Sequence, residues 1–486
     1  PPRRGSHTLR TFLAVAFPAA ASFQAGALPV ETHPESESSR TAHVEILKFY
    51  GLYEDQALQD YVNEVGTRVA RHSDWPDAEF KFFVLDDDAI NAFTTGCCYI
   101  YVHRGLLNYL DSEAELATVL GHEIAHVTAK HPQKRRTQGI LANILAIGAT
   151  LATGSGAIGQ LANLGAGAWV QGYGRENEME ADRLGLVFAT KAGYRPEAMA
   201  EVFKVFKAQE RFEMDRARQE GREPRIYHGV FSSHPAPDAR TVQAAKGAAR
   251  ISNEPPGGWI DNRNVFLRNL DGLPYGSSRV QGIVRDNRFY HAEMGITMAF
   301  PRGWTVDNLR DRVLAYTRNK DSVMQVTVEP RPPTQSPREF LLKHLKGKSI
   351  AFSEAVQSNG MEGFSAVTRG GSPLDNGQGP VRWTVLYRDS SAFVFAGASR
   401  ASVNSRPEAD GVITSVIGTM RGLRPSEFPL AEPYRIAVVP FDGKTSLADY
   451  AREIPVEKYQ LEELELMNGL YPDKQPQFGQ LFKVVQ

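Results

Sequence analysis

The chain has 486 residues, of which 42% are hydrophobic and 23% are charged, and its formal net charge is -1. A chain of this length is too long for a single hydrophobic core, so we expect about three domains. The balanced charge, together with the lack of an arginine-rich stripe, argues against binding to nucleic acid.

Residues 1–28 are predicted to be a signal peptide. Three arginines precede an apolar run over residues 11–21, and small residues follow it. The run is shorter than the roughly twenty residues that span a bilayer. We therefore expect cleavage and a periplasmic or other extracytoplasmic location, with an amphipathic anchor or a disordered tail as the alternative.

The first folded domain is predicted over residues 40–250. Apolar residues recur at helical intervals over residues 43–71, with Gly51 interrupting them, and Phe80 to Leu85 has the composition of a short buried strand. Asp86-Asp87-Asp88 ends that strand. Because no glycine-and-glutamate loop accompanies the three aspartates, we favour a solvated turn over a calcium or magnesium site.

The next segment, residues 91–107, predicts a pair of strands. A strand placed directly before a metal-binding helix can hold an extended peptide by backbone pairing. An ordinary core strand is the alternative. The candidate substrate-binding residues are Asn91, Ala92, Phe93, Cys98, Tyr99, Ile100 and Tyr101.

Cys97 and Cys98 are the only cysteines, and they are adjacent in the sequence. Neighbouring cysteines exclude a disulfide framework that joins distant segments. In a strand the two side chains would point to opposite faces, one buried and one towards solvent or substrate. A bonded, redox-active pair is the less favoured alternative.

The stretch from Ser112 to His131 predicts a helix that contains the pattern H-E-x-x-H. Ser112 is placed to cap the helix, and Glu115 is placed to complete a capping box. His122 and His126 lie one turn apart, so both imidazoles could bind one zinc ion beside Glu123. The alternative is a buried amphipathic helix whose histidines only make core hydrogen bonds.

Residues 137–174 contain no charged side chain. A membrane hairpin and a buried helical pair with a glycine-rich loop both fit this composition. Each apolar arm is shorter than the roughly twenty residues needed to span a bilayer, which favours the buried pair. Contact of residues 138–172 with a membrane surface stays open.

Zinc hydrolases use three protein ligands, so a ligand outside the H-E-x-x-H helix is required. Glu178 and Asp182 lie one helical turn apart in a second predicted helix. One carboxylate could bind the metal while the other orients a ligand imidazole. Taken alone, such a pair is more often a solvated helix face.

H-E-I-A-H at residues 122–126, followed by E-N-E-M-E-A-D at residues 176–182, resembles the zinc peptidase family of HtpX, the type I CaaX prenyl endopeptidase and the periplasmic BepA-like proteases. The resemblance implies that Glu178 is the third zinc ligand and Asp182 its companion. Phe231-Ser232-Ser233-His234-Pro235 with Arg240 resembles the H-P-x-x-x-x-R motif of the family. It implies that His234 and Arg240 stabilise the oxyanion, or that His234 covers the metal.

Residues 91–107 also resemble the substrate strand of the family, whose members usually have two glycines where this chain has Cys97 and Cys98. A linker is predicted over residues 251–282. Alternating strands and two helices predict an antiparallel α+β domain over residues 283–425, and F-P-R-G-W at residues 300–304 resembles the opening of PsbP-like modules. Residues 432–486 resemble a LysM-like βααβ module. The expected fold class is therefore α+β and multidomain, with a mainly helical zincin-type peptidase domain that contains a small sheet.

Together these patterns predict an exported zinc metalloendopeptidase that binds one Zn²⁺ per chain. The resemblance implies misfolded or unassembled envelope proteins as substrates and peptidoglycan as a partner of the C-terminal module. An envelope chaperone or scaffold with a latent zinc site, binding clients or cell wall, is the alternative. It differs from the main prediction because client binding alone does not require Glu123.

Overall fold

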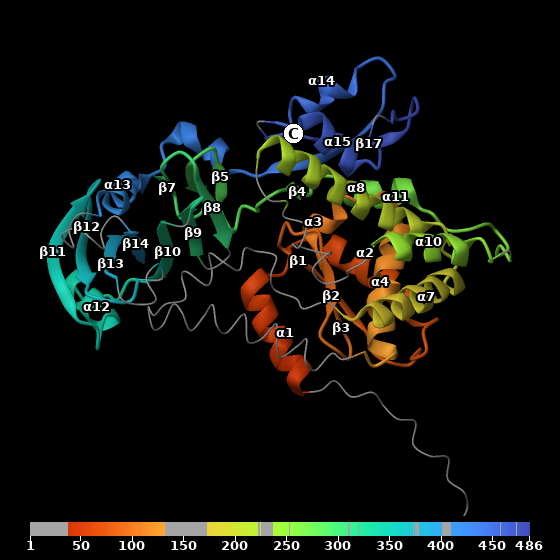
Figure 1. Ribbon diagram of the computed structural model, residues 1–486, viewed down its shortest axis with the longest axis horizontal. Helices are drawn as coiled ribbons and strands as arrows, with labels where there is room; N and C mark the ends of the chain where they lie inside the picture. The colour runs from red at the N-terminus through yellow and green to blue at the C-terminus, as the bar shows by residue number, and fades with distance from the viewer. Residues whose placement is uncertain are drawn as a thin grey trace, which may run out of the picture. The chain divides into compact units, whose positions relative to one another are not determined.

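A computed structural model describes residues 37–131, 173–221, 224, 237–251, 253–309, 312–319, 321–372, 374, 379–400, 410–456, 458–472 and 474–486 (Figure 1). The predicted signal peptide, residues 1–28, and the uncharged segment, residues 138–172, lie outside these ranges. Among the described residues, no helix is both long enough and apolar enough to span a bilayer.

Residues 37–269 are mainly helical and contain a small three-stranded sheet with the strand order β1-β3-β2. The predicted helical stretch over residues 43–71 is split at Gly51, which has a φ of 79°. The elements are α1 (Glu37–Tyr50), α2 (Gln56–Ala70), β1 (Lys81–Leu85), β2 (Ala92–Thr94), β3 (Tyr99–His103), α3 (Arg104–Leu107), α4 (Glu113–Thr128), α7 (Arg175–Lys191), α8 (Ala198–Gln219), α10 (Pro237–Ala248) and α11 (Arg263–Asn269).

Helix α4, which contains the H-E-x-x-H pattern, lies at the centre of this region and contacts α2, α7, α8 and β2 (Figure 1). The side chain of Ser112 caps it by accepting a hydrogen bond from the backbone N–H of Glu115. The carboxylate of Glu115 accepts a hydrogen bond from the backbone N–H of Asp111, at 2.7 Å, and not from that of Ser112 as a capping box requires. Every residue of α4 is buried, because neighbouring elements cover it on several sides.

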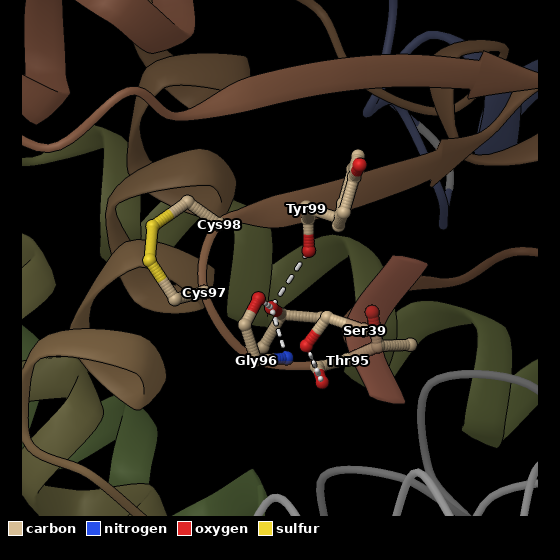
Figure 2. The surroundings of a disulfide bond; sticks show 7 residues. Ser39, Thr95, Gly96, Cys97, Cys98 and Tyr99 are labelled. Atoms are coloured by element: carbon tan, nitrogen blue, oxygen red, sulfur yellow. Dashed lines mark hydrogen bonds between the residues drawn. A yellow bond between two sulfur atoms is a disulfide. The ribbon is translucent and has the colours of Figure 1, made fainter. Parts of the chain in front are cut away.

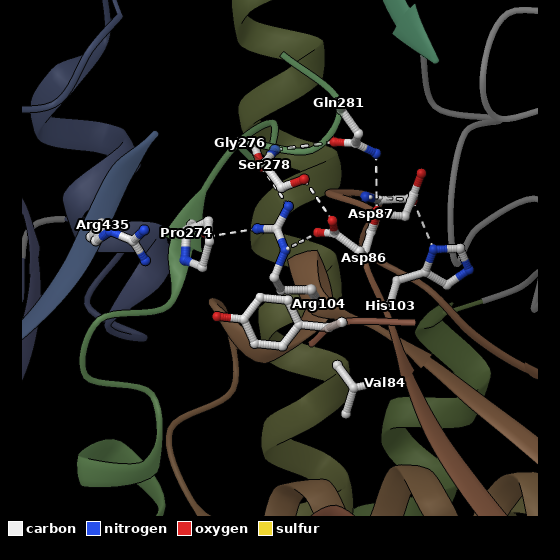
Figure 3. A network of polar contacts seen from close by, with 12 residues as sticks. Val84, Asp86, Asp87, His103, Arg104, Pro274, Gly276, Ser278, Gln281 and Arg435 are labelled. Carbon is white, nitrogen blue, oxygen red and sulfur yellow. Dashed lines mark hydrogen bonds and ion pairs between the residues drawn. The ribbon is translucent and has the colours of Figure 1, made fainter. Parts of the chain in front are cut away.

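The predicted solvated turn at the three aspartates after β1 is wrong for Asp86, which is buried, whereas Asp88 is exposed. Arg104 is fully buried and donates from Nε to Asp86, at 3.1 Å. The same guanidinium donates to the carbonyl oxygens of Pro274 and Gly276, at 2.6 and 2.7 Å, and Ser278 donates to Asp86 (Figure 3). The linker therefore docks on the end of β1 through a buried ion pair.

The described part of residues 283–422 contains two antiparallel sheets and two α-helices, as expected for an α+β region. The alternation predicts strands over residues 296–300, 313–317, 324–328, 383–388 and 392–398, and each of them overlaps a strand of the structure. The sheet β15-β7-β6-β5 is formed by β5 (Ile283–Arg285), β6 (Arg288–His291), β7 (Ile296–Ala299) and β15 (Arg421–Gly422). The sheet β11-β12-β13-β14-β10-β9-β8 is formed by β8 (Trp304–Leu309), β9 (Arg312–Thr317), β10 (Ser322–Pro330), β11 (Ile350–Ser358), β12 (Met361–Thr368), β13 (Val381–Arg388) and β14 (Ser391–Ser399). The helices are α12 (Pro337–His344) and α13 (Gly411–Thr419), and the 3-10 helix η2 (Pro425–Ala431) follows.

The C-terminal segment has the element order strand, helix, helix, strand. Its elements are β16 (Tyr434–Pro440), α14 (Leu447–Ala451), α15 (Gln460–Met467) and β17 (Leu481–Val485). Strand β16 pairs antiparallel with β17 on one side and with β4 (Pro274–Tyr275) of the linker on the other. Leu464 and Phe482 belong to the same buried hydrophobic cluster as Leu116 of α4. The C-terminal segment thus shares a core with the helical region.

Lys483 joins β17 to the start of α4. Its side chain is fully buried, and Nζ donates to the carbonyl oxygen of Leu110, at 2.6 Å, and lies 3.2 Å from Asp111. Burial lowers the pKa of Lys483, and the carboxylate of Asp111 opposes that effect. Because Asp111 directly precedes the cap residue Ser112, this contact fixes the entry into α4.

We expect Lys483→Met to lower the free energy of unfolding by about 3 kcal/mol, because the change leaves the buried acceptors at Leu110 and Asp111 without their cation. Urea denaturation of the two proteins measures the difference. Lys474→Met is the control, since Lys474 is exposed in the loop before β17, and its cost should stay within about 0.5 kcal/mol. Equal effects of the two substitutions would contradict the role of Lys483.

Candidate metal centre

Helix α4 brings the two histidines of the H-E-x-x-H pattern together. The Nε2 atoms of His122 and His126 lie 2.9 Å apart. His126 is fully buried, whereas His122 retains 8% of its exposure, and the buried Glu123 lies between them in the sequence. The helical spacing predicted this face correctly, because residues four apart lie one above the other on a helix.

Helix α7 supplies the carboxylate of Glu178, which is fully buried. Its two oxygens lie 3.5 Å from Nε2 of His122 and 3.5 Å from Nε2 of His126. Two imidazole nitrogens and one carboxylate that converge in this way match the ligand set of a catalytic zinc ion. Among the described residues, His122, His126 and Glu178 are the group able to hold a metal ion.

Two glycines allow α4 and α7 to approach closely enough for this convergence. A Cβ atom on Gly185 of α7 would lie 2.7 Å from the backbone nitrogen of His122. A Cβ atom on Gly121 of α4 would lie 2.9 Å from the carbonyl oxygen of Gly185. Backbone atoms cannot rotate away, so a larger residue at either position has to push the two helices apart.

Gly185→Ala is therefore expected to weaken zinc binding by about tenfold or more, because it shifts Glu178 relative to the two histidines. Competition with a chromogenic chelator measures the affinity. Gly174→Ala is the matched control, because a Cβ atom there would meet no atom within 4 Å. If the alanine at position 185 left the affinity unchanged, close helix packing would not determine the ligand geometry.

Asp182 and Arg240 contact His122 and Glu178, two of the candidate metal ligands. Oδ1 of Asp182 lies 3.0 Å from Nδ1 of His122, and Arg240 donates to both oxygens of Asp182, at 2.6 and 2.7 Å. Arg240 also lies 2.9 Å from Glu178. A carboxylate on Nδ1 leaves Nε2 of the imidazole facing the metal. The structure thus brings the predicted companion Asp182 next to His122.

Neighbouring charged groups shift the pKa values of His122 and Asp182. Burial alone would lower the pKa of His122, but hydrogen bonds to Asp182 and Glu178 outweigh that effect and raise its pKa to about 9. Burial would raise the pKa of Asp182, but hydrogen bonds from Arg240 and His122 hold it below the usual range. Metal binding requires a neutral imidazole, so it must displace a proton from His122 at neutral pH.

His131 and Tyr173 also contact the candidate ligand His126, and neither was predicted as a site residue. Nδ1 of His131 lies 2.8 Å from Nδ1 of His126, and Nε2 of His131 lies 3.3 Å from Glu180. The ring of Tyr173 stacks on His126 with 3.7 Å between the ring centroids. The position of His131, just after the end of the H-E-x-x-H helix, is the feature of the sequence that could have indicated its role.

The predicted substrate strand is wrong for β3. Strand β3 lies between β1 and β2, and Ile100, Tyr101 and Val102 pair with both neighbours. A peptide therefore cannot add to β3 by backbone pairing. The candidates Asn91, Ala92, Phe93, Cys98, Tyr99, Ile100 and Tyr101 are all buried. Only Ala92 and Phe93 among them belong to β2, which lies at an edge of this sheet.

Cys97 and Cys98 form a disulfide bond with each other in the turn between β2 and β3 (Figure 2). The expectation that they lie on opposite faces of a strand is therefore wrong. The same turn is held by Thr94, whose hydroxyl donates to the carbonyl oxygen of Tyr99, at 2.8 Å, and accepts from the N–H of Gly96. The pair thus shapes the connection between the two strands and does not join distant segments.

Of the two residues predicted to stabilise the oxyanion, the structure describes only one. His234 lies outside the described residues. Arg240 is buried, and its guanidinium lies against Glu178 and Asp182 and over the ring of Phe203, 4.8 Å from the centroid. These contacts give Arg240 a positioning role, and its contact with an oxyanion stays a prediction.

Comparison with known proteins shows that part of the chain is similar to a peptidase family. Residues 56–248 match peptidase family M48. The beta-barrel assembly-enhancing protease of Escherichia coli (strain K12) is 32% identical over 211 residues, which cover 41% of each chain. The mitochondrial metalloendopeptidase OMA1 of Arabidopsis thaliana is 30% identical over 154 residues, which cover 32% of this chain and 31% of that one. The chain thus matches less than half the length of these curated relatives.

Among solved structures, cyanobacterial PsbP from Synechocystis is similar to part of the chain. The match covers 29% of this chain and 94% of that protein, at 13% identity and with a TM-score of 0.23. A TM-score this low carries no argument about the fold of residues 283–425.

Proposed function

We propose that this protein is a zinc-dependent endopeptidase, because residues 56–248 match peptidase family M48. The single observation that carries the proposal is the convergence of His122, His126 and Glu178 beside Glu123 in a buried centre. Two imidazoles and a carboxylate suit zinc, and their arrangement matches a catalytic site, which has three protein ligands and one open position.

A zinc ion bound by these residues would polarise the scissile carbonyl and lower the pKa of a water molecule. Glu123 accepts the proton of the attacking water and passes it to the leaving amine, because it is the carboxylate next to both histidines. Asp182 keeps Nε2 of His122 directed at the metal position through its contact with Nδ1, at 3.0 Å. His234 is proposed to stabilise the oxyanion or to cover the metal position.

We propose that the substrates are misfolded or unassembled proteins of the cell envelope and that the protein is exported. The similarity to beta-barrel assembly-enhancing proteases supports this proposal. The domain boundaries 40–250, 283–425 and 432–486, the PsbP-like and LysM-like identities, glycan binding by the C-terminal module and membrane contact by residues 138–172 stay predictions. A client-binding scaffold with a latent zinc site is the alternative function.

Purified protein tests the proposal. Zinc per chain is measured first, and then an unfolded model protein is incubated with wild type, Glu123→Gln and Glu176→Gln. Glu176 is an exposed residue of α7, so its substitution controls for the change from glutamate to glutamine. We expect zinc in all three proteins and cleavage by wild type and Glu176→Gln alone. Zinc-loaded wild type that cleaves no substrate would instead favour the scaffold.

A further inference from the structure

A cavity of about 40 Å³ lies directly beside Glu123. Its apolar wall comes from Val119 of α4 and from Met199, Val202, Phe203 and Phe206 of α8. His122, Glu123, Asp182 and Arg240 form its polar side. The cavity therefore lies between the candidate catalytic carboxylate and a patch of apolar side chains, most of which belong to α8.

We propose that this cavity is a specificity subsite, which accepts the side chain of the substrate residue that becomes the new amino terminus after cleavage. The inference rests on the proposed function. Glu123 has to reach the nitrogen of the leaving amine to protonate it, so the residue that bears this nitrogen lies beside Glu123. The cavity lined by Glu123 therefore offers space for the side chain of that residue.

The lining selects an apolar side chain. The polar groups on one side of the cavity already contact each other, since Arg240 lies 2.6 Å from Asp182 and Asp182 lies 3.0 Å from His122. A charged substrate side chain would lose its hydration without gaining a matched partner from the apolar wall. Each methylene removed from water improves binding about fourfold. The small volume favours Val, Leu and Met over Trp.

Peptides that differ only at this position test the proposal, and mass spectrometry identifies the new amino termini. We expect kcat/KM before Leu, Val or Met to exceed that before Asp or Lys by about tenfold or more. Val202→Phe fills the cavity, so it should lower cleavage before Leu about tenfold and reduce the preference for Leu over Asp.

Val205→Phe is the matched control. Val205 lies on the same helix and is also buried, but it lines a separate cavity with Asp111 and Glu115. This substitution should leave the preference for Leu over Asp unchanged. Equal effects of the two substitutions on that preference, or wild-type cleavage that does not depend on the residue, would overturn the subsite.

A binding measurement separates this inference from the proposed function. Glu123→Gln is titrated with the same fluorescent peptides, and the Leu peptide is expected to bind about tenfold more tightly than the Asp peptide. If wild type cleaves none of the peptides, the proposed function fails, and the binding ratio still decides whether the subsite exists. A ratio near one overturns it, as does failure of both peptides to bind. These two results also decide the matter if Val202→Phe does not fold.

Discussion

Glu178→Ala is expected to remove zinc from the protein. Glu178 is fully buried, and its carboxylate oxygens lie 3.5 Å from each of the two ligand imidazoles. Removing a residue that hydrogen-bonds to a metal ligand typically lowers the metal affinity about 10- to 100-fold. Removing the ligand itself should therefore lower the zinc affinity by more than about 100-fold. Zinc content after dialysis against a weak chelator measures the result, and proteolysis should disappear with the metal.

The control for this experiment is Glu176→Ala, which removes an exposed carboxylate one residue into α7. We expect this variant to keep one zinc ion per chain. Full zinc content in Glu178→Ala would show that another group supplies the third ligand. In that case α7 would contribute only Asp182 to the centre.

Arg240→Met is expected to lower the free energy of unfolding by about 3 to 5 kcal/mol, because it leaves two buried carboxylates without their shared cation. Arg240 lies 2.6 Å from Asp182 and 2.9 Å from Glu178, and it retains only 4% of its exposure. Chemical denaturation of the zinc-free proteins measures the stability. Zinc affinity should also fall about tenfold or more, because Asp182 then loses its position against His122.

Two further variants sharpen this experiment. Arg250→Met removes an exposed arginine just after α10, and its effect should stay within about 0.5 kcal/mol. Arg240→Lys keeps the positive charge but cannot contact both oxygens of Asp182 in the planar arrangement of a guanidinium. We expect it to recover part of the stability. If Arg240→Met were as stable as wild type, the buried ion pairs would contribute nothing to the centre.

The elements that depend on local spacing were predicted well from the sequence. Ser112 caps α4, and His122 and His126 share a face, because helix geometry places residues three and four apart side by side. Five of the strands within residues 283–422 were predicted from alternation, since side chains of a strand point to opposite faces in turn.

The errors concern contacts between distant segments. The sequence analysis treated Asp86 as solvated, but its partner Arg104 also binds Pro274 and Gly276, about 170 residues further along the chain (Figure 3). It assigned substrate to Tyr99 and Ile100, but β3 is a central strand because β1 pairs with it in parallel. Periodicity describes which face of a strand is buried and does not describe which strands lie beside it.

The sequence by itself determined that one helix offers two imidazoles and a carboxylate, because these groups lie within five consecutive residues. Spacing offered Glu178 and Asp182 as candidates, and only the resemblance to a family chose Glu178 as the third ligand, since composition and spacing do not show which segments meet. The contact between the two helices is a property of the tertiary structure. Gly121 and Gly185 let α4 and α7 approach each other, and Arg240 contacts both Glu178 and Asp182. The tertiary structure also placed apolar side chains of α8 beside Glu123. These features depend on packing between elements, and the order of residues within one element does not specify that packing.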